Sequence, residues 1–503
     1  MSNTAAPASF LWFDLETFGR DARRNRIAQF ACVRTDAELR AIGDPISLLC
    51  RLDEDVLPSP QSCWVTGLTP QRCLEGLPEP LFAAEIATLA SEPNTCLAGF
   101  NNIRFDHEFL RFLFYRNFFD PYACEWQRNN SRFDLLDPLR LAYALRPEGL
   151  HWPQRADGSG PSFKLADLAL ANGIAHDSHN ALGDVLATLE LARKLKEAQP
   201  RLWNYALALR DKRRVREEIE IGKPLFYVSG RYPAERGCAA LVLPLAELSN
   251  GEASYLVFDL ACDPKPLLRL VQRPLDPPEA LCEALADLLA ELPPFALKRL
   301  RPNRQPMVVP AQQVKNTALD RLGIERQRCE QHLTLLRPHL AELGARLQAA
   351  MERASGAAED PELDLYARFV ADRDRFLFSA LRKASPNELG KYAGRWRDPR
   401  LDTLLFRYRA RHYPETLSAD EVQAWEEFRR RRYHDPELSE VTAEQYFAQI
   451  DALCAQGGEE RQGLTEELLA WADRLGIERP STLAQPASAG RANFSRSQVG
   501  AQS

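Results

Sequence analysis

Two acidic residues inside an apolar run constrain the fold of this chain more than any other feature. Residues 9–18 read Ser-Phe-Leu-Trp-Phe-Asp-Leu-Glu-Thr-Phe and are followed by a glycine. This composition predicts a buried strand. Side chains alternate between the two faces of a strand, so Asp14 and Glu16 point to the same side. Two carboxylates held together among apolar residues repel each other unless a cation joins them, and Mg²⁺ or Mn²⁺ prefers such oxygen ligands. The alternative is an exposed strand end on which both acids are solvated.

Two further motifs place acids next to predicted strands and helices. Asp106 follows a short predicted strand at 97–100 and precedes residues with helical spacing, and its alternative role is that of a helix N-cap. Further along, His179 precedes Asp184 by five positions, where another helix is expected to begin. The two residues are not neighbours on a helix, so His179 must lie on the preceding loop to reach the same site. A lone histidine on such a loop is otherwise simply exposed to solvent.

Taken in order, these motifs form the pattern of the DEDDh exonucleases. Four carboxylates, those of Asp14, Glu16, Asp106 and Asp184, can hold two metal ions about 4 Å apart that clamp the attacking and departing oxygens of a phosphoryl displacement. A neutral imidazole at His179 can accept a proton from the attacking water. The sequence therefore predicts phosphodiester hydrolysis at this site.

The chain divides into several parts by composition. Its 503 residues exceed what one hydrophobic core supports, and about 150 residues per domain suggests three units. Strands expected at 27–33 and 46–52 and helices at 81–90 and 182–195 predict a mixed α/β region up to residue 200. Strand-like pieces then follow at 224–229, 239–244 and 254–260. Beyond about residue 315 helical spacing dominates, as in 333–351, 443–454 and 464–475. The polar residues from 479 onward predict disorder.

The composition also narrows the class of protein. No apolar run approaches the roughly 18 residues needed to span a bilayer, and no secretory signal is evident, so we expect a cytoplasmic protein without a membrane role. The eleven cysteines are never spaced Cys-x-x-Cys and are expected to be reduced. The net charge of −6 does not favour a protein that coats nucleic acid. Phosphate contacts must come from local basic runs, which are otherwise ordinary solvated helix faces.

Beyond the acidic residues, the chain resembles the bacterial exodeoxyribonuclease I family. The resemblance rests on the segments 13–19, 101–106, 114–123 and 143–149, with further similarity at 320–327 and 408–414. It implies four consecutive parts: a ribonuclease-H-like exonuclease domain at 1–200, a small SH3-like β-barrel domain at 201–354, a helical C-terminal domain at 355–478 and a disordered tail at 479–503.

The resemblance also implies an activity and a partner. Such an enzyme degrades single-stranded DNA from the 3′ end and releases nucleoside 5′-monophosphates with two Mg²⁺ ions, for which Mn²⁺ can substitute. It acts in DNA repair and recombination, and it binds the acidic, apolar C-terminal tail of single-stranded DNA-binding protein. All five catalytic positions of the family match this sequence, with His179 as the general base. We expect a monomer.

Several residues are candidates for binding the DNA. Glu16, Thr17 and Thr66 match positions that line the channel for the terminal nucleotide in similar nucleases; strand packing and an ordinary turn are the alternatives for the two threonines. Phe163 and Lys164 are candidates for base stacking and a phosphate contact, whereas capping of a helix by the preceding serine is the alternative.

The partner tail calls for a different kind of pocket. A peptide that is apolar and ends in a carboxylate requires basic side chains beside a hydrophobic surface. The candidates are Arg146, Tyr205, Lys315 and Arg337. Ordinary solvated arginines are the alternative.

Two rival functions remain open on the sequence. An RNA exonuclease or a proofreading subunit uses the same five residues, but such proteins can be little more than a catalytic domain, whereas here the resemblance continues to about residue 414. A DNA-binding scaffold without activity is the rival from another class, and the intact set of five residues argues against it.

Overall fold

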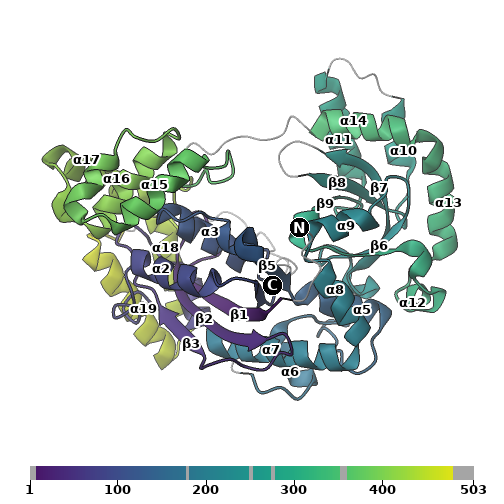
Figure 1. Ribbon diagram of the computed structural model, residues 1–503, viewed down its shortest axis with the longest axis horizontal. Helices are drawn as coiled ribbons and strands as arrows, with labels where there is room; N and C mark the ends of the chain where they lie inside the picture. Colours follow the sequence, from purple (N-terminus) through teal and green to yellow (C-terminus); the bar gives the residue numbers. More distant parts are fainter. Residues whose placement is uncertain (1–6, 177–179, 249–252, 273–277, 352–359, 480–503) are drawn as a thin grey trace, which may run out of the picture.

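The computed structural model describes residues 7–176, 180–248, 253–272, 278–351 and 360–479. Figure 1 shows a first sheet in the lower centre, a second sheet with its helices on the right, and a group of helices on the left. Chain order runs from the centre to the right and then to the left. The first sheet is therefore flanked by two parts of the chain that are distant from it in sequence.

The first sheet is mixed and has its acidic strand in the middle. Its strand order is β3-β2-β1-β4-β5, with antiparallel pairing of β1 with β2 and of β2 with β3, and parallel pairing of β1 with β4 and of β4 with β5. The predicted α/β class is confirmed. The strands are β1 (Ser9–Thr17), β2 (Ile27–Asp36), β3 (Ile46–Leu49), β4 (Thr95–Gly99) and β5 (Ser131–Asp134).

The two faces of β1 belong to two different hydrophobic cores. Phe10 and Trp12 pack into the core that includes buried residues of α7, whereas Leu11, Phe13 and Leu15 pack into the core that includes residues of α2 and α3. This alternation is the one expected of a strand buried on both sides. The first part of the chain contains the helices α1 (Pro60–Thr66), α2 (Glu79–Ala90), α3 (Asp106–Arg116), α4 (Ala123–Trp126), α5 (Leu136–Leu145), α6 (Leu165–Ala171), α7 (Ala181–Ala198), α8 (Pro200–Ala208) and α9 (Lys212–Glu218).

The second sheet is antiparallel throughout, with the order β10-β6-β7-β8-β9. Its strands β6 (Leu225–Val228), β7 (Ala239–Leu248) and β8 (Ser254–Asp259) confirm the three predicted strand-like pieces, and β9 (Leu297–Leu300) and β10 (Met307–Pro310) are additional. The accompanying helices are α10 (Lys265–Val271), α11 (Pro278–Glu291), α12 (Asn316–Arg321), α13 (Arg326–Leu336) and α14 (Leu340–Met351).

The predicted helical run at 333–351 is interrupted. The structure has a 3₁₀ turn, η5 (Arg337–His339), between α13 and α14. Pro338 lies in this turn, and its ring cannot donate the backbone hydrogen bond that a continuous helix requires. The other 3₁₀ turns are η1 (Gln127–Asn129), η2 (Ala234–Arg236), η3 (Pro302–Arg304), η4 (Ala311–Gln313), η6 (Pro386–Tyr392) and η7 (Pro414–Thr416).

The last part of the chain is helical, as the sequence predicts. Two of its helices begin with a capping box, in which Ser418 and Thr442 bond the backbone of the first turn. Within the described residues, no helix is long and apolar enough to cross a membrane. Residues 480–503 of the predicted disordered tail lie outside the described residues. The helices are α15 (Asp372–Lys383), α16 (Arg400–His412), α17 (Ala419–His434), α18 (Ala443–Cys454) and α19 (Glu459–Arg474).

Candidate active site

Three carboxylates meet at the carboxyl end of β1. Asp14 and Glu16 point from β1 toward the face covered by α7, and Asp184 lies in the first turn of that helix. One oxygen from each of the three side chains lies within 4.8 Å of the others. Because strand alternation and the packing of α7 bring them together, the site follows directly from the fold of the first sheet.

Asp106 joins this group from the start of α3, a helix whose apolar residues pack against the other face of β1. It is the first residue of α3, and its Oδ1 accepts a hydrogen bond from the backbone N–H of Leu15 at 3.1 Å. Leu15 is the residue between Asp14 and Glu16, so Asp106 lies next to both acids. The N-cap position of α3 is taken by Phe105, so Asp106 does not serve as the helix cap.

Two histidines precede α7 in the sequence, and the structure describes one of them. Asn180 caps the helix by accepting a hydrogen bond from the N–H of Leu182 at 3.2 Å, which fixes the turn that contains Asp184. His176, a residue the sequence analysis did not select, contacts the carboxylate of Asp184 through its Nε2. His179, the predicted general base, lies outside the described residues. In the sequence, His176 lies three residues before His179, and this spacing is the signal by which it could have been found.

The electrostatics of the group favour a bound cation. Burial and the carboxylate of Asp184 raise the pKa of Glu16 to about 8. Burial, followed by the charge of Asp106, raises the pKa of Asp14 well above its usual value, and burial likewise raises the pKa of Asp106. Among the described residues, neither Asp14 nor Glu16 forms an ion pair with a lysine or arginine. The carboxylates of Asp14 and Glu16 are hard oxygen ligands whose charge burial disfavours, and such a donor set fits a divalent cation.

The predicted DNA-binding residues occupy different environments. Thr17 is buried and donates to the backbone oxygen of Gly19 at 2.6 Å, and Thr66 ends α1 and donates to the backbone oxygen of Ser62 at 3.1 Å. Lys164 is exposed at the start of α6. Phe163 is only 6% exposed. In this structure the Phe163 ring therefore faces other side chains and not the solvent.

The contacts of Phe163 show what surrounds it. Its ring packs edge-on against Tyr143 and Trp152, and the guanidinium of Arg140 lies 5.5 Å from the ring centroid. The preceding Ser162 donates to the carboxylate of Asp167 in the first turn of α6, but the N-cap position of this helix is Lys164 and no side chain caps it, so Ser162 is not the helix cap. None of these contacts involves DNA, so the DNA-binding roles of Phe163 and Lys164 stay predictions.

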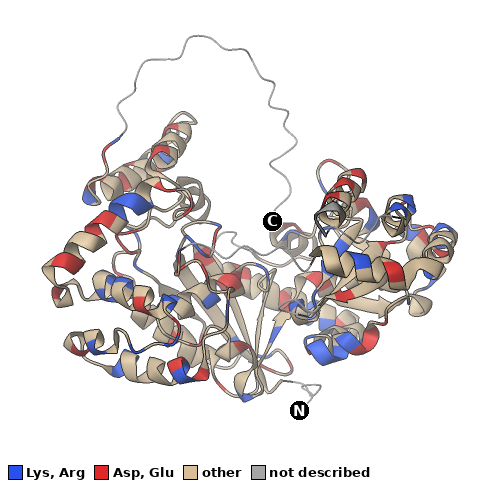
Figure 2. Cartoon of the chain, turned by 90° about the horizontal axis from the view of Figure 1, so that it is seen from above, with Lys and Arg blue, Asp and Glu red and all other residues tan. Residues whose placement is uncertain are grey.

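A cleft lies beside the acidic group. It has a volume of about 400 Å³ and is lined by arginines, acidic residues and several aromatic residues from the first and last parts of the chain. Figure 2 shows Lys and Arg interspersed with Asp and Glu along the helices, and the cleft has the same mixed character, since Asp21, Glu108 and Glu440 also line it. The lining includes Arg20, Arg23, Arg104, Phe105, Phe109 and Tyr366.

Three of the four predicted partner-binding residues line one pocket. Arg146, Tyr205 and Lys315 surround a cavity of about 490 Å³ together with apolar side chains that include Leu141 and Val309. The hydroxyl of Tyr205 donates to the backbone oxygen of Val308 at 2.7 Å. The fourth residue, Arg337, is exposed in η5 and is not part of this lining.

A second group of potential ligands has a different character. Ligand atoms of Asp53, Glu79 and His412 also lie within 4.8 Å of one another. Arginines already neutralise its carboxylates, since Arg116 contacts Glu79 at 2.7 Å and Arg26 contacts Glu79 at 3.5 Å and Asp53 at 3.7 Å. A divalent cation there would lie next to positive charge, so this group does not fit a metal site as the first one does.

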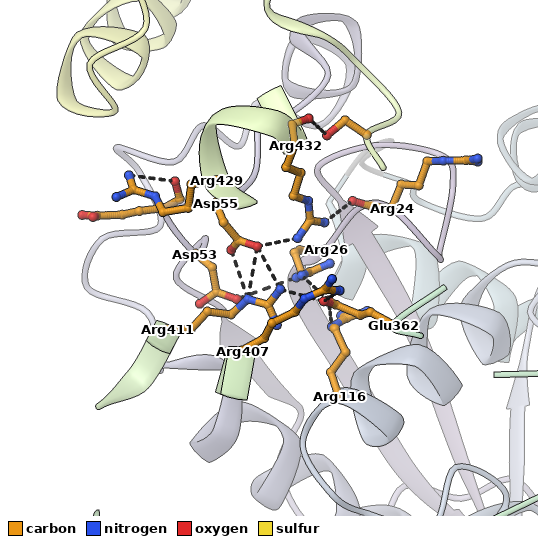
Figure 3. A network of polar contacts seen from close by, with 12 residues as sticks. Arg24, Arg26, Asp53, Asp55, Arg116, Glu362, Arg407, Arg411, Arg429 and Arg432 are labelled. Atoms are coloured by element: carbon orange, nitrogen blue, oxygen red, sulfur yellow. Dashed lines mark hydrogen bonds and ion pairs between the residues drawn. The ribbon is translucent and has the colours of Figure 1, made fainter. Parts of the chain in front are cut away.

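These residues belong to a buried network that joins the first and last parts of the chain. Figure 3 shows Asp55 and Glu362 facing several arginines from α16 and α17. Asp55 accepts hydrogen bonds from Arg411 at 2.8 Å and from Arg432, and Arg411 also contacts Glu362 at 2.8 Å. The sequence pattern did not reveal this network, because Asp55 lies more than 300 residues from its arginine partners in the last part of the chain.

The mixed sheet and its acidic site define an exonuclease domain. Family models match three consecutive stretches of the chain: the exonuclease family over residues 11–192, the exonuclease I SH3-like domain over 210–353 and the exonuclease I C-terminal domain over 359–475. Exodeoxyribonuclease I of Escherichia coli (strain K12) is 40% identical over 437 residues, which cover 86% of this chain and 91% of that protein. The chain belongs to the exodeoxyribonuclease I family, and it is therefore an enzyme that hydrolyses phosphodiester bonds.

Solved structures agree in fold over nearly the whole chain. The moderately thermophilic exonuclease I from Methylocaldum szegediense superposes with a TM-score of 0.84 at 40% identity and covers 93% of this chain and 99% of its own. A zinc-bound complex of E. coli exonuclease I with single-stranded DNA gives a TM-score of 0.84 at 36% identity and covers 93% and 100%. An SSB/exonuclease I structure with the inhibitor CFAM gives 0.84 at 37% identity, again covering 93% and 100%. The predicted family and order of folds are confirmed.

Proposed function

We propose that this enzyme removes nucleotides from the 3′ end of single-stranded DNA and releases nucleoside 5′-monophosphates. The observation that carries the proposal is the meeting of three carboxylates within 4.8 Å, with Asp106 bonded to the backbone between two of them. The complex of an E. coli relative with single-stranded DNA supports the choice of substrate.

Asp14, Glu16, Asp106 and Asp184 are the residues that would hold two Mg²⁺ ions, with Mn²⁺ as a substitute. When bound, the ions supply positive charge to the scissile phosphate and to the attacking and departing oxygens. The carboxylates provide hard oxygen ligands whose mutual repulsion such charge relieves. Glu16, at the end of β1, also lies where a terminal nucleotide would approach, together with Thr17 and Thr66.

Proton transfer is assigned to the loop before α7. His179 accepts the proton of the attacking water as the general base, since it precedes the ligand Asp184 by five residues on that loop. His176 contacts Asp184 and holds its carboxylate in place. The two histidines thus have separate tasks, one at the reacting water and one at a metal ligand.

The single strand approaches through the cleft next to Asp106. Phe105 and Tyr366 supply aromatic surface for bases, and Arg20 and Arg23 are the arginines of the lining that would meet phosphates, beside the acids Asp21, Glu108 and Glu440 of the same lining. This combination binds single strands with little regard to sequence, because every base has a face that can stack. Phe163 and Lys164 remain candidates for contacts further along the strand.

The cavity of about 490 Å³ fits the C-terminal tail of single-stranded DNA-binding protein. Arg146 and Lys315 provide positive charge for a terminal carboxylate, and Leu141, Tyr205 and Val309 provide an apolar wall. The solved SSB/exonuclease I structure of a relative supports this choice of partner. Arg337 would contribute only if the peptide extends beyond the cavity.

The proposal also covers the domain boundaries of the chain and the cellular role of the enzyme. The three family matches support domains at 1–200, 201–354 and 355–478. We place the enzyme in the cytoplasm as a monomer that acts in DNA repair and recombination, in keeping with the bacterial family to which it belongs.

The test is a time-resolved digestion of a 5′-labelled single-stranded DNA oligonucleotide. The matching duplex and an RNA oligonucleotide serve as controls, and each is incubated in Mg²⁺ and in EDTA. We expect magnesium-dependent shortening of the single-stranded DNA from its 3′ end, greatly slowed in His179→Ala. Preferential digestion of RNA, or equal rates in His179→Ala and wild type, would contradict the substrate or the general base.

A further inference from the structure

The turn that delivers Asp106 to the active site is held by a segment of the SH3-like part. Residues 301–306 connect β9 and β10 and contain η3. They extend from the second sheet to the end of β5 in the first sheet, where Arg132 donates to the backbone oxygen of Asn303 at 2.8 Å. Two side chains of this segment, Arg304 and Gln305, continue the contact toward the active site.

Gln305 acts on the edge of the first sheet. It is 4% exposed and has a backbone φ of 48°, in the left-handed region that few residues other than glycine adopt. Its side-chain oxygen accepts from the N–H of Asp134 at 2.7 Å, and its side-chain nitrogen donates to the backbone oxygen of Asp134 at 3.4 Å. Asp134 ends the edge strand β5, so Gln305 supplies the hydrogen bonds that a further strand would make there.

Asp134, which Gln305 holds, itself bonds the turn before α3. Its carboxylate accepts hydrogen bonds from the N–H of Asn101 at 2.9 Å and from the N–H of Ile103 at 3.3 Å. Arg304 holds the other side of the same turn, since it donates to the backbone oxygen of Ile103 at 2.9 Å and pairs with Glu108 of α3 at 2.8 Å. The backbone N–H groups of Asn101 and Ile103 and the backbone oxygen of Ile103 are therefore all bonded by side chains from outside the turn.

Asp106 follows this turn by three residues and needs a fixed backbone. Its carboxylate is buried beside two other acids, an arrangement that repulsion opposes, and its own hydrogen bond in the site is to the N–H of Leu15. A small displacement of the turn would move the carboxylate away from β1. Residues that orient a metal ligand from behind commonly change metal affinity or activity by about 10- to 100-fold when removed.

We propose that Arg304 and Gln305 are positioning residues for Asp106, so that the SH3-like part completes the active site of the exonuclease domain. The inference rests on the proposed role of Asp106 as a metal ligand. It assigns the SH3-like part a task in the chemical step, separate from any contact it makes with DNA.

The test compares the full-length variants Arg304→Ala and Gln305→Ala with wild type. The matched control is Arg321→Ala, because Arg321 also bonds backbone oxygens of the first part of the chain, those of Tyr143 and Ala144, but at a distance from the Asp106 turn. The rate kcat and the KM for a single-stranded oligonucleotide are measured against Mg²⁺ concentration. Mn²⁺ binding without DNA is measured by electron paramagnetic resonance.

In both variants we expect kcat to fall about 10- to 100-fold and the Kd for Mn²⁺ to rise about 10-fold, with little change in KM. Arg304→Lys, which keeps one donor, should recover part of the loss, and Arg321→Ala should behave as wild type. Unchanged kcat and Mn²⁺ affinity in folded Arg304→Ala and Gln305→Ala would overturn the inference. So would an equal loss in Arg321→Ala, because the effect would then reflect general loosening of the two parts.

Asp106→Ala separates this inference from the proposed function. If Asp106→Ala retains activity, the assignment of the metal ligands is wrong. If Asp106→Ala is inactive while the Arg304 and Gln305 variants equal wild type, only the positioning role fails. Should Gln305→Ala not fold, Arg304→Lys and Arg304→Ala decide the question, because Arg304 is partly exposed and its replacement leaves the sheet edge intact.

Discussion

Asp14 is held in an environment that disfavours its charge. Burial and the neighbouring carboxylates raise its pKa, which means that the protein without metal is stabilised when this group is neutral. We predict that Asp14→Asn raises the free energy of unfolding in EDTA, because the neutral amide removes a charge that burial and the neighbouring carboxylates disfavour. The same variant should lose activity by more than about 100-fold, since a ligand is removed outright.

Denaturant unfolding of wild type and Asp14→Asn, with and without Mg²⁺, checks this prediction. In Mg²⁺ the order of stabilities should reverse, because only the wild type gains the free energy of binding the ion. A variant less stable than wild type in EDTA would show that the carboxylates do not repel each other in the folded protein.

Glu16 makes the stability of the metal-free enzyme depend on pH. Burial and Asp184 raise its pKa from 4.5 to about 8, so between these values the folded state holds a proton that the unfolded state has lost. The contribution of Glu16 to stability is therefore full below about pH 4.5 and disappears as the pH rises to about 8. We predict that, in EDTA, the unfolding free energy of wild type falls relative to that of Glu16→Gln across this range.

The measurement is the difference in unfolding free energy between wild type and Glu16→Gln at pH 5, 6, 7 and 8. Other buried groups titrate in the same interval, and taking the difference cancels their contribution. A difference that stays constant with pH would contradict the raised pKa of Glu16. Excess Mg²⁺ should flatten the dependence, since a bound cation favours the charged carboxylate.

At the scale of elements, the sequence predicts those segments whose pattern is local. The strand at 9–18, the helix starting at Asp106 and the helix containing Asp184 each carry enough apolar periodicity to be recognised, and they supply all four carboxylates of the site. The short strand β5 was missed because its four residues include Arg132 and Asp134. The support of Asp106 by Gln305 could not be predicted from the sequence, since about 200 residues separate the two and no local pattern connects them.

The cavity between α5, α8 and the segment before α12, which we propose binds the peptide, leads to a prediction about its charged lining. Replacing Arg146 or Lys315 by alanine removes a charge from the cavity lining and should weaken binding of a peptide with the acidic, apolar tail by about tenfold, or about 1.4 kcal/mol. Arg337→Ala is the matched control, because its side chain is exposed outside the lining, and it should change the Kd much less.

Fluorescence anisotropy of a labelled peptide gives the three dissociation constants. An effect of Arg337→Ala as large as that of Arg146→Ala would place the peptide along η5 instead of in the cavity. Exonuclease activity on free single strands should stay unchanged in all three variants, because the pocket is separate from the acidic site.

At the scale of the whole molecule, the exonuclease sheet is joined to the helical part by buried charges as well as by apolar packing. Leu365, Phe378 and Tyr408 of the last part share a hydrophobic core with β1. Beside it, Asp55 is fully buried between Arg411 and Arg432, which lower the pKa of its carboxyl group. Removing one member of such a network leaves an uncompensated buried charge.

We predict that Asp55→Asn lowers the free energy of unfolding by about 3–5 kcal/mol. Glu467→Gln is the control: Glu467 pairs with Arg72 across the same two parts of the chain, but both side chains are partly exposed, and such pairs contribute about 1 kcal/mol or less. Because the pKa of Asp55 is lowered, its contribution should be present above about pH 4 and be lost in stronger acid. Unfolding of both variants is measured against wild type. A loss in Asp55→Asn no larger than that in Glu467→Gln would contradict the stabilising role of the buried network.

The location of the metal tests the assignment of the active site most directly. A crystal of the enzyme with Mn²⁺ and a single-stranded oligonucleotide, measured at the manganese absorption edge, shows the ion positions by anomalous scattering. We predict peaks at about 2.0–2.4 Å from carboxylate oxygens of Asp14, Glu16 and Asp184, and none at Asp53, Glu79 and His412. Manganese at the second group, with none at the carboxyl end of β1, would contradict the assignment.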